Sequence, residues 1–190
     1  TVAHGLVSAF ADPTPLTALL SGDVGTGKTL AFLLPALAAH RAGARVAIIT
    51  PRLLLADQIA QEILSKFGSV VTKLERVEAS GTIFDPSSVL VGTSGLATVA
   101  RRCGYVPQVL ICDEQHKFST AEREALVGPY THLVEVSATP VPRSLAASLY
   151  EGMRIFNLRQ CPVDKHIESE VLDMSRRADV VARIREALSK

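Results

Sequence analysis

The sequence contains no tryptophan, and aromatic residues make up only 5% of its 190 positions. It also has little net charge, because 20 Lys and Arg side chains balance 19 Asp and Glu side chains to leave a formal charge of +1. The first feature argues against a base-stacking platform, and the second excludes a protein that coats nucleic acid by bulk charge. Any contact with nucleic acid must therefore be made by a few local groups.

Cysteines and long apolar runs are scarce as well. The three cysteines, Cys103, Cys112 and Cys161, show no CxxC spacing, which argues against a disulfide framework or a zinc site and favours a reducing cytoplasmic setting. The longest apolar run, residues 30–39, contains Pro35 and is shorter than the roughly 18–20 residues that cross a bilayer, so we expect no membrane partner. There is no signal-peptide pattern, and because the chain begins with Thr1 we expect it to be a piece of a longer protein.

The apolar residues that are present, 47% of the chain, are enough for the core of about one domain. Short β-branched runs alternate with helical patterns, which predicts an α/β fold with a parallel sheet covered by helices on both faces. The predicted strands are residues 17–21, 46–50, 70–74, 89–91, 109–113 and 132–137. The predicted helices are residues 28–42, 53–67, 95–102, 121–127 and 143–150, with Ser119 or Thr120 at the start of the fourth.

The character of the sequence changes after residue 152. Residues 159–165 are polar and contain Pro162, which is typical of a linker, and residues 167–172 alternate like a strand. Ser175 is predicted to cap a final helix with one apolar stripe. Since one strand and one helix cannot form a domain alone, we divide the chain into a domain over 1–156 and, over 157–190, a linker and the first strand-helix unit of a truncated second domain.

The strongest motif is a GxxxxGKT loop between a predicted strand and a predicted helix. Its glycines allow a tight turn in which amide N–H groups point at phosphate oxygens, and the helix N-terminus adds positive potential. We expect the lysine to reach the β- and γ-phosphates of ATP and the threonine hydroxyl to bind Mg²⁺. A glycine-rich turn with a coincidental lysine is the structural alternative. The loop consists of Gly22, Asp23, Val24, Gly25, Thr26, Gly27, Lys28 and Thr29.

An apolar strand that ends in two carboxylates is the second motif. Asp113 and Glu114 follow residues 109–112, and in a phosphate-loop fold the first acid of such a strand completes the shell of Mg²⁺. Glu114 would then orient or deprotonate the attacking water. Without the phosphate loop, two acids at a strand end would be interpreted as a solvated turn. Cys112 is interpreted as a small buried apolar residue.

Five motifs in order, over about residues 22–152, resemble superfamily-two helicases, and within them the RecG-type DNA helicases. The resemblance rests on GDVGTGKT, TPRLLLADQ at 50–58, VGTSGL at 91–96, DEQHKF at 113–118 and VSATPVPRSL at 136–145. It implies a RecA-like P-loop domain over 1–156, followed by the beginning of a second helicase lobe. Residues 30–35 (LAFLLP) also resemble DEAD-box RNA helicases, although the DEQH tetrad differs from theirs.

The resemblance implies further roles. The residues that couple phosphate state to movement between two lobes would be Gln115, His116, Ser137, Ala138 and Thr139. The residues that touch the sugar-phosphate backbone would be Pro51, Arg52, Gly92 and Thr93. His4 stands where the family has an adenine-reading glutamine, and an ordinary surface histidine is an equal interpretation. The second lobe would supply an arginine finger, which is worth 10³ or more in rate in related enzymes.

The sequence thus predicts the ATP-binding lobe of an ATP-dependent helicase that moves on or unwinds DNA, branched, single-stranded or double-stranded. Lys28, Asp113, Glu114 and His116 are its predicted catalytic residues, Thr29 and Asp113 its metal ligands, and ATP and Mg²⁺ its cofactors. We expect the isolated chain to bind nucleotide and to hydrolyse it slowly. Two alternatives remain: an RNA helicase or remodelling ATPase, and a non-catalytic module that binds nucleotide or nucleic acid.

Overall fold

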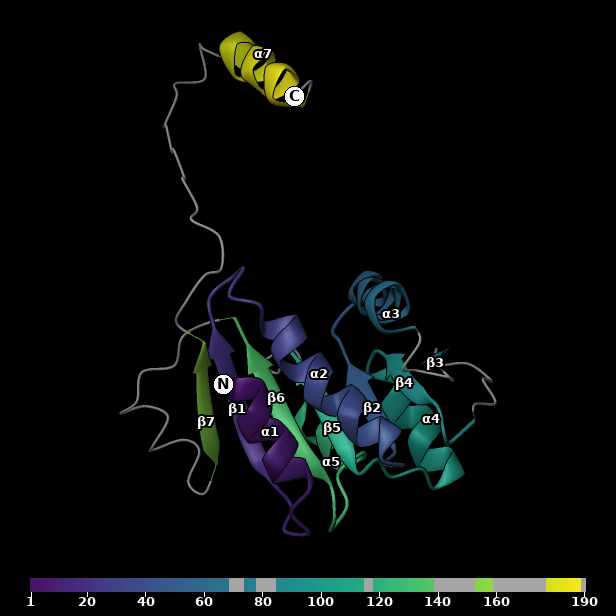
Figure 1. Cartoon of the computed structure of the whole chain (residues 1–190). Coiled ribbons are helices and arrows are strands. Elements are labelled where there is room, and N and C mark those ends of the chain that lie inside the picture. Colours follow the sequence, from purple (N-terminus) through teal and green to yellow (C-terminus); the bar gives the residue numbers. More distant parts are fainter. Residues whose placement is uncertain (69–73, 78–84, 115–117, 139–152, 159–176, 189–190) are drawn as a thin grey trace.

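A computed structural model describes residues 1–68, 74–77, 85–114, 118–138, 153–158 and 177–188. Its centre is a seven-stranded sheet in the order β3-β4-β2-β5-β6-β1-β7, in which every pairing is parallel (Figure 1). The strands are β1 (Thr17–Gly22), β2 (Val46–Ile49), β3 (Leu74–Val77), β4 (Val89–Gly92), β5 (Val109–Asp113), β6 (His132–Ser137) and β7 (Arg154–Leu158). The predicted α/β class is therefore confirmed.

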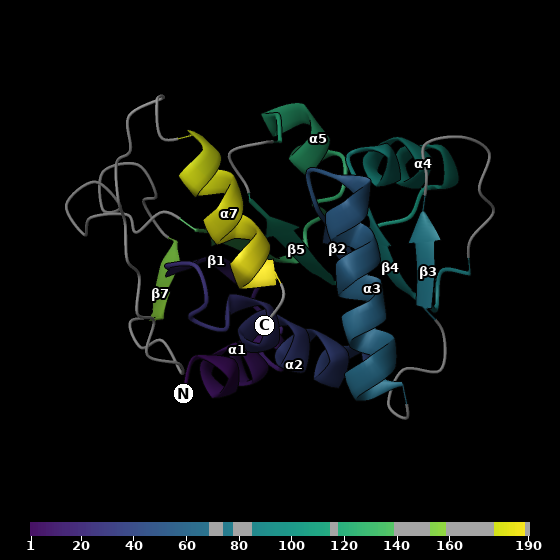
Figure 2. The same cartoon turned by 90° about the horizontal axis from the view of Figure 1, so that it is seen from above.

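Helices cover both faces of the sheet. They are α1 (Val2–Phe10), α2 (Lys28–Arg41), α3 (Leu53–Phe67), α4 (Gly95–Cys103), α5 (Thr120–Glu124) and α7 (Arg177–Leu188). Seen from above, α1 and α2 lie on one side of the sheet and α4 and α5 on the other (Figure 2). Two apolar clusters fill the space between helices and sheet, one against α1, α2 and α3 and the other against α4 and the residues that flank α5.

Alternation along each strand divides its side chains between the two clusters. In β2, Val46 and Ile48 belong to the first cluster, whereas Ala47 and Ile49 belong to the second, and all four are fully buried. A strand with helices on both faces must be apolar at every position, which is why such short uninterrupted runs predicted the parallel sheet correctly. None of the helices in the described ranges has the length and apolar composition of a membrane span.

Two elements were missed by the sequence predictions. The helix α1 begins after Thr1, whose hydroxyl accepts a hydrogen bond from the backbone N–H of His4. The strand β7 pairs with β1 at the edge of the sheet. The two elements support each other, because Gly5 of α1 lies so close to Phe156 of β7 that an added Cβ would be 3.0 Å from the ring. The pairing of β7 with β1 is a tertiary effect, whereas α1 has an amphipathic pattern of its own that the sequence predictions did not use.

Helix α1 also contacts the start of β6. The ring of Phe10 lies 5.5 Å from that of His132, and His132 Nδ1 accepts a hydrogen bond of 3.1 Å from the backbone N–H of Leu16. Burial lowers the pKa of His132, while the nearby carboxylate of Asp12 acts in the opposite direction. The neutral imidazole is therefore part of the packing at this end of the sheet.

Other predicted boundaries moved. The strand predicted over 70–74 lies at Leu74–Val77, with 70–73 outside the described residues, and the helix predicted over 121–127 ends at Glu124. Ser119, one of the two predicted starts, is the N-cap of α5. The predicted helix over 143–150, the strand over 167–172 and the Ser175 cap lie outside the described residues, although α7 occupies most of the predicted final helix. Strand β7 crosses the proposed domain boundary at residue 156, so the sheet includes residues 157 and 158.

Candidate nucleotide site and nucleic-acid track

Because all strands are parallel, their carboxyl ends lie on the same side of the sheet, and the predicted motifs meet there. Ser21 of β1 is in register with Ser137 of β6, and Val136 is in register with Asp113 of β5. The phosphate loop that follows Gly22 is therefore two strands away from the acidic end of β5, about 10 Å at the usual strand spacing. Ser137, at the end of β6, lies between them.

The phosphate loop has an ordered internal network. The Lys28 ammonium donates hydrogen bonds of 2.7 Å to the carbonyl oxygen of Gly22 and 2.8 Å to that of Asp23. The Thr26 hydroxyl donates to the same Asp23 carbonyl at 2.8 Å, and the backbone N–H of Val24 donates to the Asp23 carboxylate at 2.7 Å. Lys28 is also the first residue of α2, so its ammonium and the first amides of the helix lie beside one loop.

Glycine is required in this loop for two different reasons. A Cβ at Gly22 would lie 2.7 Å from Thr26 Oγ1, 2.9 Å from Leu158 Cβ and 3.1 Å from the Leu158 carbonyl oxygen, so the loop and β7 leave no room for a side chain. Gly27 has open space around its Cα, but its φ of +80° is in the left-handed region that other residues rarely adopt. Close approach and backbone conformation thus explain two of the motif's glycines.

The acidic pair lies in a partly buried position at the end of β5. Burial and the neighbouring Glu114 charge raise the pKa of Asp113, whereas a backbone hydrogen bond and the positive charge of Lys28 lower it. The influence of Lys28 indicates that the lysine and the aspartate belong to one electrostatic site. Glu114 has a φ of +55°, which is uncommon for a residue with a side chain and marks a sharp turn at the end of the strand.

Backbone hydrogen bonds join the two predicted nucleic-acid segments. Ile49 is in register with Gly92, and the backbone N–H of Thr50 donates to the Gly92 carbonyl at 2.9 Å. The Thr50 hydroxyl donates to the carbonyl of Arg52 at 3.0 Å. Pro51, Arg52, Gly92 and Thr93 are therefore neighbours at the ends of β2 and β4, and we call these four residues the nucleic-acid track.

The remaining predicted site residues lie at the end of β6, at the starts of α2 and α1, or outside the described residues. Ser137 is buried at the end of β6, Ala138 follows it partly exposed, and Thr29 is partly exposed in the first turn of α2. His4 is exposed in the first turn of α1. Gln115, His116 and Thr139 lie outside the described residues.

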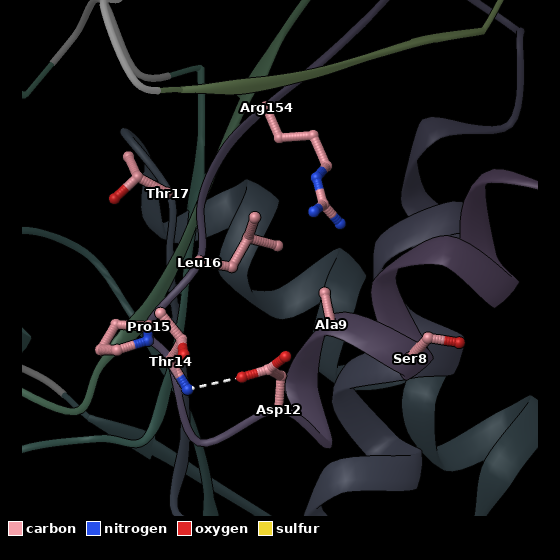
Figure 3. A pocket seen from close by; sticks show the side chains of 8 residues that line it. All are labelled: Ser8, Ala9, Asp12, Thr14, Pro15, Leu16, Thr17 and Arg154. Atoms are coloured by element: carbon pink, nitrogen blue, oxygen red, sulfur yellow. Dashed lines mark hydrogen bonds between the residues drawn. The ribbon is translucent and has the colours of Figure 1, made fainter.

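A pocket of about 540 Å³ lies at the opposite end of β1 (Figure 3). It is open to solvent between α1, the loop before β1 and the first residue of β7, with Asp12 hydrogen-bonded to the backbone N–H of Thr14 at 2.8 Å. Because β1 separates it from the phosphate loop, it is not part of the candidate nucleotide site. The pocket is lined by Ser8, Ala9, Asp12, Thr14, Pro15, Leu16, Thr17 and Arg154.

A charged pair beside the site was not predicted from the sequence. Glu135, in the middle of β6, is 1% exposed and forms an ion pair with Arg123 of α5. A glutamate inside an otherwise apolar strand is a usable signal, because a buried carboxylate needs a cationic or hydrogen-bonding partner. The partner itself was not predictable, since it comes from another element.

A parallel sheet with a phosphate loop after β1 and paired acids after β5 defines a P-loop domain of the RecA-like type, the fold seen in helicase lobes. The comparison with known families places the chain more narrowly. It belongs to the DEAD/DEAH box helicase family, whose profile matches residues 13–147.

Curated relatives carry the name ATP-dependent DNA helicase RecG. The protein from Aquifex aeolicus (strain VF5) is 33% identical over 201 residues, which cover 93% of this chain and 24% of that protein. The protein from Acidithiobacillus ferridurans is 31% identical over 190 residues, which cover 92% of this chain and 27% of that protein. The chain therefore spans about a quarter of the length of these relatives.

Solved structures share the fold. A structure of RecG bound to a three-way DNA junction matches with a TM-score of 0.72 and 21% identity, over 98% of this chain and 27% of that one. A DEAD box protein from the hyperthermophile Methanococcus jannaschii matches with a TM-score of 0.60 and 20% identity, over 96% of this chain and 56% of that one. At these identities the likeness shows the fold alone.

Proposed function

We propose that this chain is the ATP-binding lobe of an ATP-dependent helicase or translocase that acts on DNA. The observation that carries the proposal is the register of the strand ends, which brings the phosphate loop, Ser137 and Asp113 to one edge of the sheet. The names of the curated relatives support DNA as the nucleic acid. The three-way junction bound in the RecG structure supports a branched form of that DNA. The free thiols of Cys103 and Cys112 fit the cytoplasmic setting that we include in the proposal.

In this proposal the loop amides and Lys28 hold the triphosphate of ATP. The Thr29 hydroxyl and the Asp113 carboxylate are the hard oxygen ligands that Mg²⁺ prefers. The fit is supported by the raised pKa of Asp113, since a partly buried carboxylate beside a second acid gains from a bound cation. When bound, Mg²⁺ would neutralise charge that develops on the phosphates. Glu114 orients the attacking water and accepts its proton.

The remaining roles follow the resemblance. The nucleic-acid track binds the sugar-phosphate backbone through amides, a hydroxyl and one guanidinium, which agrees with the low net charge. Ser137, Ala138 and Thr139, with Gln115 and His116, report the state of the nucleotide to a second lobe. That lobe begins within residues 157–190 and supplies the arginine finger, so the isolated chain hydrolyses ATP slowly. His4 contributes to adenine binding.

The test is nucleotide binding and hydrolysis by the chain with and without forked DNA. We expect Mg-ATP binding, measured by calorimetry, that falls at least about tenfold in Lys28→Ala. Lys66→Ala is the matched control, because Lys66 is an exposed lysine that pairs with Glu62 on α3, and it should leave binding unchanged. Equal loss in both variants, or binding that survives Lys28→Ala, would refute the nucleotide site.

The same assay separates the alternatives. Stimulation by RNA rather than by forked DNA would favour an RNA helicase, an alternative that the DEAD/DEAH box family profile keeps open. Nucleotide binding without any hydrolysis, even when a second lobe is added, would favour a non-catalytic module. Rapid DNA-stimulated turnover by the isolated chain would contradict the need for a second lobe.

A further inference from the structure

The strand β7 lies beside the first residue of the phosphate loop. The pairing of β1 with β6 reaches Ser21, which is in register with Ser137. The pairing of β1 with β7 reaches one residue further, to Gly22, which is in register with Leu158. Figure 1 shows β7 along β1 at the edge of the sheet. Among the described strands, β7 is therefore the one whose pairing extends to the start of the loop.

The contact between Leu158 and the loop is close. A Cβ on Gly22 would lie 2.9 Å from Leu158 Cβ and 3.1 Å from the Leu158 carbonyl oxygen. It would also lie 2.7 Å from Thr26 Oγ1, on the other arm of the loop. Leu158 and Thr26 therefore border the same small space beside Gly22. Because packed groups hold one another in place, removal of the Leu158 side chain would take away one wall of that space.

The position of Gly22 matters because its carbonyl binds the lysine of the loop. The Lys28 ammonium donates a hydrogen bond of 2.7 Å to the Gly22 carbonyl oxygen. Its other acceptor is the Asp23 carbonyl oxygen at 2.8 Å, to which the Thr26 hydroxyl also donates. A displacement of Gly22 would move an acceptor that holds the ammonium, and hydrogen bonds weaken steeply when their geometry is poor.

Leu158 is anchored in the core of the domain. It is partly buried and packs, together with Phe156, against the apolar cluster on the α1 and α2 side of the sheet. It belongs to none of the sequence motifs and lies beyond residues 13–147, which the family profile matches. The phosphate loop thus begins beside a core residue that no motif would identify.

We propose that Leu158 is a positioning residue of the nucleotide site, which holds Gly22 in place and thereby sets the carbonyl that binds the Lys28 ammonium. A displacement of about 1 Å caused by a residue remote from the chemistry is enough to weaken a well-oriented site. The inference rests on the proposed function and deepens it. It makes nucleotide binding depend on the strand that leads, in the sequence, to the segment proposed as the second lobe.

A merely structural role for Leu158 makes a different prediction. If Leu158 only fills the core, its loss lowers the free energy of unfolding, but the folded chain binds nucleotide normally. The cost of Gly22→Ala is then the same with and without the Leu158 side chain. If Leu158 positions the loop, affinity falls in the folded chain. The cost of Gly22→Ala also shrinks when the Leu158 Cβ is absent, because the added methyl group gains space.

The experiment measures Mg-ADP binding by the full chain with calorimetry, well below the thermal transition of each variant. Leu158→Gly removes the Cβ that lies beside Gly22, whereas Leu158→Ala keeps it and removes only the branched end. Asn157→Gly is the matched control, because Asn157 is an exposed residue of the same strand and alternation directs its side chain to the opposite face. It adds the same glycine flexibility to β7. Gly22→Ala is then combined with Leu158→Gly.

We expect Leu158→Gly to raise the Mg-ADP dissociation constant at least about fivefold, Leu158→Ala to raise it about twofold, and Asn157→Gly to change it less than about twofold. In the Leu158→Gly background, Gly22→Ala should cost less than about threefold, against about tenfold by itself. If Leu158→Gly does not fold, Leu158→Ile decides instead. It keeps the volume but adds a branch at the Cβ beside Gly22, and should raise the dissociation constant about threefold.

Unchanged affinity in Leu158→Gly, or in Leu158→Ile where that variant decides, would overturn the inference. An equal loss in Asn157→Gly would overturn it as well, and so would a cost of Gly22→Ala that is the same in both backgrounds. Absence of Mg-ADP binding in the unmodified chain would instead refute the proposed function, so the two failures are distinguishable.

Discussion

Replacing Gly22 by alanine tests the close contact between the phosphate loop and the edge strand. The new Cβ would lie 2.7 Å from Thr26 Oγ1 and 2.9 Å from Leu158 Cβ. Thr26 is held by its own hydrogen bond to the Asp23 carbonyl, and Leu158 is held by the pairing of β7 with β1. Neither neighbour can move without losing a contact, so both the loop and β7 must shift.

The magnitude follows from the cost of overpacking. Inserting a methyl group into a packed site costs typically about 1–3 kcal/mol of the free energy of unfolding. For a chain of this size, about 2 kcal/mol lowers the melting temperature by about 4–8 °C. Because the loop amides also lose their alignment, we expect nucleotide affinity to fall about tenfold, equivalent to about 1.4 kcal/mol.

The assay is thermal unfolding together with titration of a fluorescent nucleotide. Gly5→Ala is the matched control, because its Cβ meets only the Phe156 ring, at 3.0 Å, and an aromatic side chain can rotate away. It should cost less stability and leave nucleotide affinity unchanged. If Gly22→Ala binds nucleotide normally, or if both variants behave alike, the argument from close approach is wrong.

Three further predictions concern burial. The Cys112 thiol is fully buried, and burial raises its pKa. A thiol reagent should therefore modify the exposed Cys103 in the native state and Cys112 only after unfolding. Peptide mass mapping would show which of the two is modified. Burial lowers the pKa of His132, so its neutral form contributes fully to stability above the unfolded pKa near 6.5, and this contribution is lost as the pH falls toward the folded pKa. His132→Gln should therefore make the urea midpoint depend less on pH in that window. An unchanged pH dependence would contradict the prediction. Phe32→Ala should lower the free energy of unfolding by about 3–5 kcal/mol, because Phe32 is buried in the core. Leu54→Ala, on the exposed side of α3, should lower it by less than about 0.5 kcal/mol. Similar losses in urea unfolding would mean that the core is assigned wrongly.

Local patterns were sufficient for most of the sheet and its helices. The runs at β2, β4 and β5 are apolar at nearly every position, β1 and β6 are buried at all but one position each, and α3 has the bounds that its pattern predicted. Such segments are predictable because burial on both faces leaves a composition signal in the strand itself. The loop at 22–29 and the acids at 113–114 were found for a related reason, since their chemistry requires particular residues at fixed spacing.

Prediction from the sequence failed for features that depend on a contact with a distant segment of the chain. β7 is an edge strand with partly exposed residues, and its partner β1 is far away in the sequence. Likewise, Glu135 stands out in its strand, but nothing in the sequence names Arg123 as its counterion. Helix α1 was missed for another reason, because its Thr1 cap and apolar face were a local signal that the predictions did not use.

The class of fold and the phosphate-loop motif, which we propose holds a triphosphate, could be predicted from the sequence alone, because each belongs to contiguous segments. The tertiary structure alone places Ser137 between the phosphate loop and Asp113, joins Thr50 to Gly92, and pairs Arg123 of α5 with Glu135. These relations depend on the order of strands in the sheet. That order is set by how helices pack on two faces at once, and no single segment of the chain contains it.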